Sequence, residues 1–164
     1  MTLPSDRLFT PEIDPMAIEL RKMYQDFVRQ INGEAKVFTA KVFGATSAGV
    51  GTYSNQDGFY ILSGQMVDVY YNITWTAHTG TGNLYVEMPF ISNFSALNYM
   101  GVIDNTSGGL NYSAGYTEVK TKLAPGTREA TIVENGDNTG SQALAMVSSA
   151  IITGWNRFPI KIEY

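Results

Sequence analysis

The stretch from Gln65 to Pro89 constrains the fold more than any other part of the chain. Its first half alternates apolar and polar residues, and the apolar set is Val67, Val69, Tyr71, Ile73 and Trp75. Alternation of this kind places one face of a β-strand in a core and the other face in solvent. Residues 79–83 are a turn rich in glycine and small polar residues, after which the alternation resumes at Leu84, Val86 and Met88. The stretch therefore predicts a long β-hairpin.

Length and composition exclude several classes of protein. The chain has 164 residues, enough for one domain with a core and a small appendage. Its net charge is −4, and no cluster of lysine and arginine interrupts the acidic balance, so we expect no nucleic-acid partner. There is no cysteine, which excludes disulfides and thiolate metal sites. We expect no metal and no cofactor.

The N-terminal sequence carries no targeting signal. Residues 1–7 lack an apolar segment of signal-peptide length, and no run of about 18 apolar residues occurs in the chain. We therefore expect a protein that is made in the cytoplasm and does not insert into a membrane.

A helix is predicted over residues 15–32. Asp14 and Pro15 are a favourable N-cap and first helical residue, and Gly33 suits the position just past the helix end. Its apolar stripe is Met16, Leu20, Met23, Phe27 and Ile31. The stripe could dock on the protein's own sheet or pair with copies of itself, because two heptads are marginal for an autonomous coiled coil. Residues 1–33 are predicted to be an extended arm and helix, and residues 34–164 a β domain.

The remaining sequence consists of short strand patterns separated by turn signals. Residues 55–58 end in Asp-Gly and predict a hairpin turn, and residues 105–109 and 135–140 read as loops. Residues 143–152 fit either a helical turn or a strand. Many short strands of this kind predict an all-β fold, an antiparallel β-sandwich of jelly-roll type with one N-terminal α-helix.

No catalytic constellation stands out. His78 is the only histidine, and we interpret it as a turn residue that bonds locally. The carboxylates are scattered, and no calcium-loop or phosphate-binding pattern occurs. We predict no catalytic residue, and a small hydrolase is the least favoured class.

Aromatic residues are the more informative group, with ten tyrosines, eight phenylalanines and two tryptophans. Tyr71 and Trp75 belong to the predicted core. Tyr70, Tyr85 and Trp155 are candidates for exposed positions, where an aromatic ring suits subunit contacts or sugars. Subunit contact is the favoured use, and glycan contact the alternative.

The block from Gly51 to Phe90 resembles a module of tailed-bacteriophage structural proteins. In that module a Gly-x-Tyr strand and a Gly-x-x-Val strand lead to Thr-Gly-Thr-Gly and then to a strand that ends in Leu-Pro-Phe. Here Met88 replaces the leucine. The last strand, with Gly154 and Trp155 upstream, is similar to the end of the module, so the resemblance covers residues 50–164.

The resemblance implies a non-enzymatic virion component, such as a tail fibre or a capsid decoration or spike, assembled as a homotrimer. We expect residues 1–33 to bind other virion proteins and the β domain to face outward. A glycan on the host cell surface is a partner that the resemblance allows for this domain. The outward loops would be 78–83, 104–109 and 135–141, with contact residues His78, Asn83, Asn105 and Asn138. The alternative is a carbohydrate-binding module.

Overall fold

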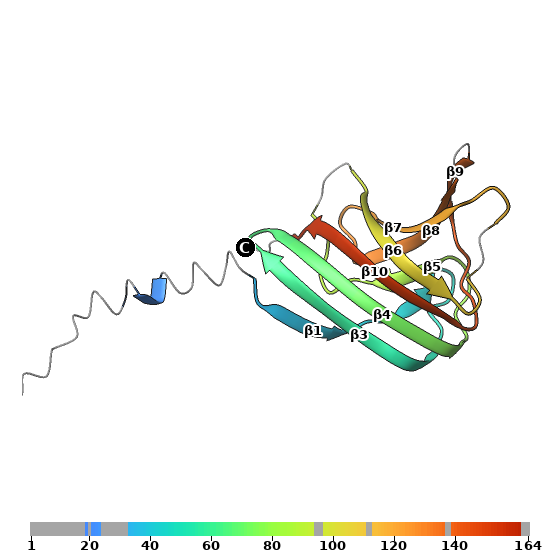
Figure 1. Cartoon of the computed structure of the whole chain (residues 1–164), viewed down its shortest axis with the longest axis horizontal. Coiled ribbons are helices and arrows are strands. Elements are labelled where there is room, and N and C mark those ends of the chain that lie inside the picture. The colour runs from blue at the N-terminus through green and yellow to red at the C-terminus, as the bar shows by residue number, and fades with distance from the viewer. Residues whose placement is uncertain are drawn as a thin grey trace, which may run out of the picture.

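The structure is a computed structural model, and it describes residues 19, 21–23, 33–93, 97–110, 113–136 and 139–161. Glu19 and residues 21–23 are helical, as the sequence predicts. Everything regular from residue 35 onward is β-strand (Figure 1). The strands are β1 (Ala35–Thr39), β2 (Val42–Gly44), β3 (Gly51–Ser63), β4 (Met66–His78), β5 (Leu84–Glu87), β6 (Tyr99–Ser107), β7 (Glu118–Leu123), β8 (Glu129–Gly136), β9 (Thr139–Ala143) and β10 (Ala150–Pro159).

All the strands belong to one antiparallel sheet that curls over on itself. The order is β1-β3-β4-β10-β6-β7-β8-β5-β2, and β9 pairs with β8 beside this path. Strands β1, β3, β4, β10 and β6 form one layer, and β8, β5 and β2 lie across from it (Figure 1). The predicted all-β antiparallel sandwich is confirmed. The strand that ends the β domain, β10, lies between β4 and β6 and so holds distant parts of the chain together.

The predicted hairpin strand supplies the centre of the core. Its apolar set is buried, with exposed fractions of 0–3% for Val67, Val69, Tyr71, Ile73 and Trp75. The indole N–H of Trp75 donates to the Val147 carbonyl at 3.0 Å, which satisfies its one polar atom inside the core. Alternation along β4 therefore decides which face of the sheet is inside.

The hairpin predicted at residues 55–58 is wrong. Residues 51–63 form one continuous strand, and the chain turns instead after Ser63, where Gly64 has a positive φ of 61°. Gly58 is required by packing, because a Cβ at this position would lie 2.6 Å from the Phe38 ring. Register shifts near Tyr53 mark the irregularity that the polar run introduces into the strand.

Two predicted loops are shorter than expected. Residues 105–107 belong to β6, and residues 135–136 belong to β8. The ambiguous segment 143–152 is not helical, since residue 143 ends β9 and residues 150–152 begin β10. Residues 105–107 continue β6 because they pair with Thr153, Ile152 and Ile151 of β10, and residues 135 and 136 pair with Glu118 of β7 and Thr139 of β9.

Of the predicted helical stripe, the structure describes Met23. Met23 is exposed, while Met16, Leu20, Phe27 and Ile31 lie outside the described residues. Gly33 has a φ of 51°, the left-handed conformation that commonly follows a helix end. In the described part of the chain, no helix has the length and hydrophobicity that a membrane span requires.

A polar cluster crosses the core beneath β6. The side-chain amide of Asn156 on β10 donates to the Thr121 hydroxyl of β7 at 2.6 Å, and the Tyr71 hydroxyl of β4 donates to the side-chain amide oxygen Oδ1 of Asn156 at 3.4 Å. Asn156 and Thr121 reach each other because Gly101, on the strand between them, has no side chain in the way. Burial raises the pKa of the Tyr71 phenol above its ordinary range, so the group stays a neutral donor.

Gly154→Ala tests this arrangement. Gly154 is paired with Tyr71, and an added Cβ would lie 2.6 Å from the phenol carbon that carries the hydroxyl. The buried ring has little room to move, so we expect a loss of about 1–3 kcal/mol in the free energy of unfolding. Gly140→Ala is the matched control, because nothing lies within 4 Å of its added Cβ. Urea unfolding measures both, and equal midpoints for the two variants would contradict the proposed packing.

Candidate functional site

Outward-facing apolar side chains from five neighbouring strands form a continuous line on one face of the sheet. The backbone register pairs Val37 of β1 with Phe59 of β3, and Phe59 with Tyr70 of β4. Tyr70 is paired with Trp155 of β10, and Trp155 with Val102 of β6. Directly opposed residues have their Cβ atoms about 5 Å apart, so each side chain contacts the next. We call these five residues the aromatic row.

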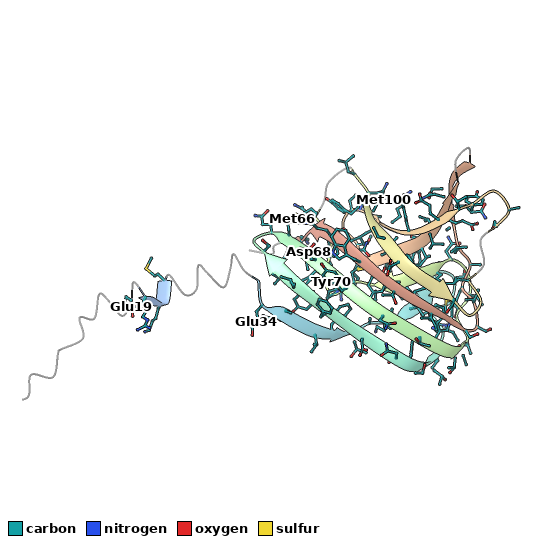
Figure 2. The ribbon with its side chains drawn as sticks, viewed as in Figure 1. Glu19, Glu34, Met66, Asp68, Tyr70 and Met100 are labelled. Carbon is teal, nitrogen blue, oxygen red and sulfur yellow. The ribbon has the colours of Figure 1, made fainter. Side chains whose placement is uncertain are left out.

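The aromatic row lies on the face that the alternation of β4 leaves outside. The exposed fractions are 88% for Val37, 41% for Phe59 and 50% for Val102. Met100, two residues before Val102 on β6, is exposed on the same face (Figure 2). A contiguous apolar surface of this extent is unusual on a monomeric protein and is typical of a binding surface.

The rings of the row stand on edge. Phe59 and Tyr70 are stacked, with ring centroids 4.7 Å apart and planes 12° apart. This separation equals the spacing of neighbouring strands, so the flat faces point along the row and the ring edges point outward. Trp155 covers the other side of Tyr70, with centroids 6.3 Å apart. A partner molecule therefore meets ring edges over Phe59 and Tyr70.

Polar side chains border the row on both sides. Asp57, Asn72 and Thr153 share the next register position on one side. On the other side Asp68 and Arg157 are paired across β4 and β10, and the guanidinium Nε lies 3.8 Å from the carboxylate (Figure 2 labels Asp68). An apolar centre with a polar rim is the usual composition of a protein–protein contact surface.

Trp155 differs from the core residue Trp75 in the hydrogen bonding of its indole nitrogen. Its indole nitrogen is buried, yet it finds no hydrogen-bond partner among the residues that the structure describes. An unpaired buried N–H costs free energy. Trp155 therefore contributes less to the stability of the domain than its size suggests.

The three aromatic residues predicted as exposed do not form one group. Tyr70 and Trp155 are adjacent in the row, as just described. Tyr85 lies on β5, where its ring contacts Phe43 of β2 at 5.5 Å between centroids. Strands β5 and β2 are at the opposite end of the sheet order from the row.

His78 makes two hydrogen bonds: the one with Gly80 is local, as interpreted from the sequence, and the one with Val42 joins it to a distant strand. The Gly80 N–H donates to Nδ1 at 2.9 Å. Because Nδ1 is an acceptor, Nε2 carries the hydrogen and donates to the Val42 carbonyl at 3.2 Å. The Tyr53 hydroxyl donates to the same carbonyl at 2.9 Å. Both nitrogens of His78 are thus engaged, Nε2 with the first residue of β2 and Nδ1 with the turn that follows β4.

The other predicted loop residues are only partly described. Asn83 is exposed and forms an isolated β-bridge with Ala145. The backbone of Asn105 pairs with Thr153 inside β6, while its side chain and all of Asn138 lie outside the described residues. Among the contacts of the described residues, none joins Asn83 or Asn105 to His78 or to the aromatic row.

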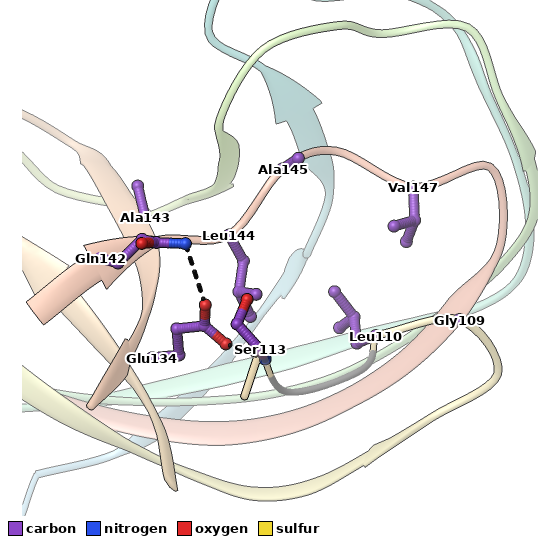
Figure 3. A pocket seen from close by; sticks show the side chains of 9 residues that line it. All are labelled: Gly109, Leu110, Ser113, Glu134, Gln142, Ala143, Leu144, Ala145 and Val147. Atoms are coloured by element: carbon purple, nitrogen blue, oxygen red, sulfur yellow. Dashed lines mark hydrogen bonds between the residues drawn. The ribbon is translucent and has the colours of Figure 1, made fainter. Parts of the chain in front are cut away.

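Sequence reasoning missed a buried carboxylate. Glu134 is fully buried and accepts hydrogen bonds from the Ser113 N–H at 2.8 Å and from the Gln142 amide at 3.2 Å. It borders a cavity of about 280 Å³ that Leu110 and Leu144 also line (Figure 3). The signal was present, because Glu134 continues the inward series of Ala130 and Ile132 along β8. Among the described residues, no group of three metal-ligating side chains occurs here or elsewhere.

Comparison with known proteins supports the fold but no family. No known protein family matches the sequence, and no curated protein matches it. The crystal structure of the Dettilon tailspike protein is similar over 76% of this chain, with a TM-score of 0.55 and 17% sequence identity. The chain spans 23% of the length of that protein. At this identity the likeness concerns the fold.

The two tryptophans allow a matched test of the row. Trp75→Phe removes a satisfied hydrogen bond in the core and leaves a cavity, so we expect a loss of about 2–4 kcal/mol in the free energy of unfolding. Trp155→Phe removes an unpaired N–H from a partly exposed ring, and we expect a change below about 1 kcal/mol. Denaturant unfolding measures both. A larger loss for Trp155→Phe than for Trp75→Phe would show that the row stabilises the domain rather than serving contact.

Proposed function

We propose that the chain is a non-enzymatic structural component of a tailed-bacteriophage particle, with its β domain on the particle surface. The observation that carries the proposal is the fold shared with a tailspike protein over 76% of the chain. The sequence block from Gly51 to Phe90 supports it independently, since its likeness to phage structural modules comes from motifs and not from coordinates.

The N-terminal segment is the proposed attachment element. Residues 1–33 precede the β domain, and the predicted stripe of Leu20 and Phe27 has an apolar surface without an established partner. An amphipathic helix of two heptads gains stability when it packs against other chains. We propose that this helix joins three copies and holds them to other virion proteins, on a tail fibre or a capsid spike.

A binding role fits the described side chains better than a catalytic one. Both nitrogens of His78 are engaged by backbone groups, and Glu134 is buried and hydrogen-bonded. Sugar binding by Tyr70 is also less favoured, because sugars stack on the flat face of a ring and the faces of Tyr70 are covered by Phe59 and Trp155. Host-surface contact through the segments 78–83, 104–109 and 135–141 is part of the proposal.

Leu20→Asp in the full chain tests the attachment role. A carboxylate in the stripe would have to be buried against a partner, so we expect incorporation into purified particles to fall by at least about tenfold. Gln25→Asp introduces the same charge on the opposite side of the predicted helix and should leave incorporation unchanged. Immunoblotting of purified particles gives the readout. Equal incorporation of both variants would exclude the stripe as the anchor, and absence of the unmodified chain from particles would refute the function itself.

A further inference from the structure

We propose that the aromatic row is the surface through which the β domain packs against a second copy of this chain. The proposal rests on the oligomeric part of the proposed function and adds to it a specific surface. It concerns the outer face of β1, β3, β4, β10 and β6, centred on Phe59, Tyr70 and Trp155.

The size of this face matches what a stable contact between copies needs. Strands β4 and β10 are paired over the whole of Ala150–Pro159, which gives a length of about 33 Å at the usual rise per residue. Five strands at their usual spacing give a width of about 24 Å, so the face covers roughly 800 Å². Standard protein–protein interfaces bury about 800 Å² on each partner.

The charges on the face are compatible with contact between identical surfaces. Like faces repel each other when they carry one sign of charge. The outward positions of β3, β4, β10 and β6 carry Asp57, Asp68 and Asp104 together with Arg157, and the next strand of the sheet, β7, adds Glu118, Lys120 and Lys122. Charges of both signs are therefore present on this side of the sheet, and two of them, Asp68 and Arg157, lie beside each other.

The shape of the row favours a protein partner over a sugar. Ring edges together with the methyl groups of Val37 and Val102 form a ridged apolar surface. Side chains of another copy can interdigitate with such a ridge, as between the layers of a β-sandwich. The described part of the N-terminal helix does not cover it, since Met23 is exposed.

Sedimentation of the full-length chain tests the proposal with a matched pair of variants. Val102→Asp places a carboxylate in the row, and we expect the association constant between copies to fall by at least about tenfold. Val50→Asp is the control, because Val50 is 77% exposed and immediately precedes β3, about 30 Å along the chain from Phe59. It should associate like the unmodified chain. Circular dichroism melting confirms that both variants fold.

Thiol labelling locates the contact independently. The chain has no cysteine, so Val102→Cys and Val50→Cys each carry a single thiol. We expect maleimide labelling at residue 102 to slow as the protein concentration rises, and labelling at residue 50 to stay constant. Labelling at 102 that is slow at every concentration would mean that another part of the same chain covers the row, which overturns the proposal.

The remaining outcomes are equally decisive. A full-length chain that stays monomeric, or equal association of Val102→Asp and Val50→Asp, overturns the proposal. Association through the row by a chain that is absent from purified particles would refute the proposed function and leave this inference standing. Loss of particle incorporation in Leu20→Asp with unchanged labelling at residue 102 would separate attachment from packing of the β domains.

Discussion

The register of β4 between its two neighbours is the constraint on which the rest of the structure depends. Strand β4 pairs along its length with β3 on one side and with β10 on the other. Because successive side chains point to opposite faces, this register buries Tyr71 and Trp75 and at the same time turns Tyr70 outward. A shift by one residue would exchange the two sets and place the core residues in water. The core and the candidate contact surface are therefore two consequences of one pairing.

Glycines in the sheet make room on its inner face for large and polar side chains. Gly58 and Gly154 are the partners of Tyr71 on either side, and each leaves room for an aromatic ring inside the layer. Gly101 lets Asn156 bond to Thr121 across the strand between them. The inner face thus accommodates large and polar side chains at positions without a Cβ. On the outer face, the described part of the chain packs no second layer over the row of apolar side chains.

The sequence predicted the all-β fold and the central strand, but not every strand boundary and not the arrangement of the outer surface. Alternation from Val67 to Trp75 identified β4 and its inner face correctly, because that pattern is local. The Asp-Gly pair at residues 57–58 led to the wrong prediction of a turn. A glycine at this position suits either a turn or close packing against the Phe38 ring, and the sequence does not show that β1 brings Phe38 to it. Tyr70 and Trp155 were identified as exposed aromatics, but their adjacency depends on the pairing of β4 with β10, which are 85 positions apart at that point. Glu134 was missed because a buried carboxylate needs hydrogen-bond donors, and its donors, Ser113 and Gln142, are brought to it only by the fold.

The central claim is that the outer face of this sheet is built for contact between copies. The most direct measurement is a cryo-electron microscopy density map of the full-length chain in its associated state. Our account predicts that a neighbouring copy covers Phe59, Tyr70 and Trp155, with the polar residues around them at the rim of the contact. A map in which the copies associate while these three side chains face open solvent would contradict it.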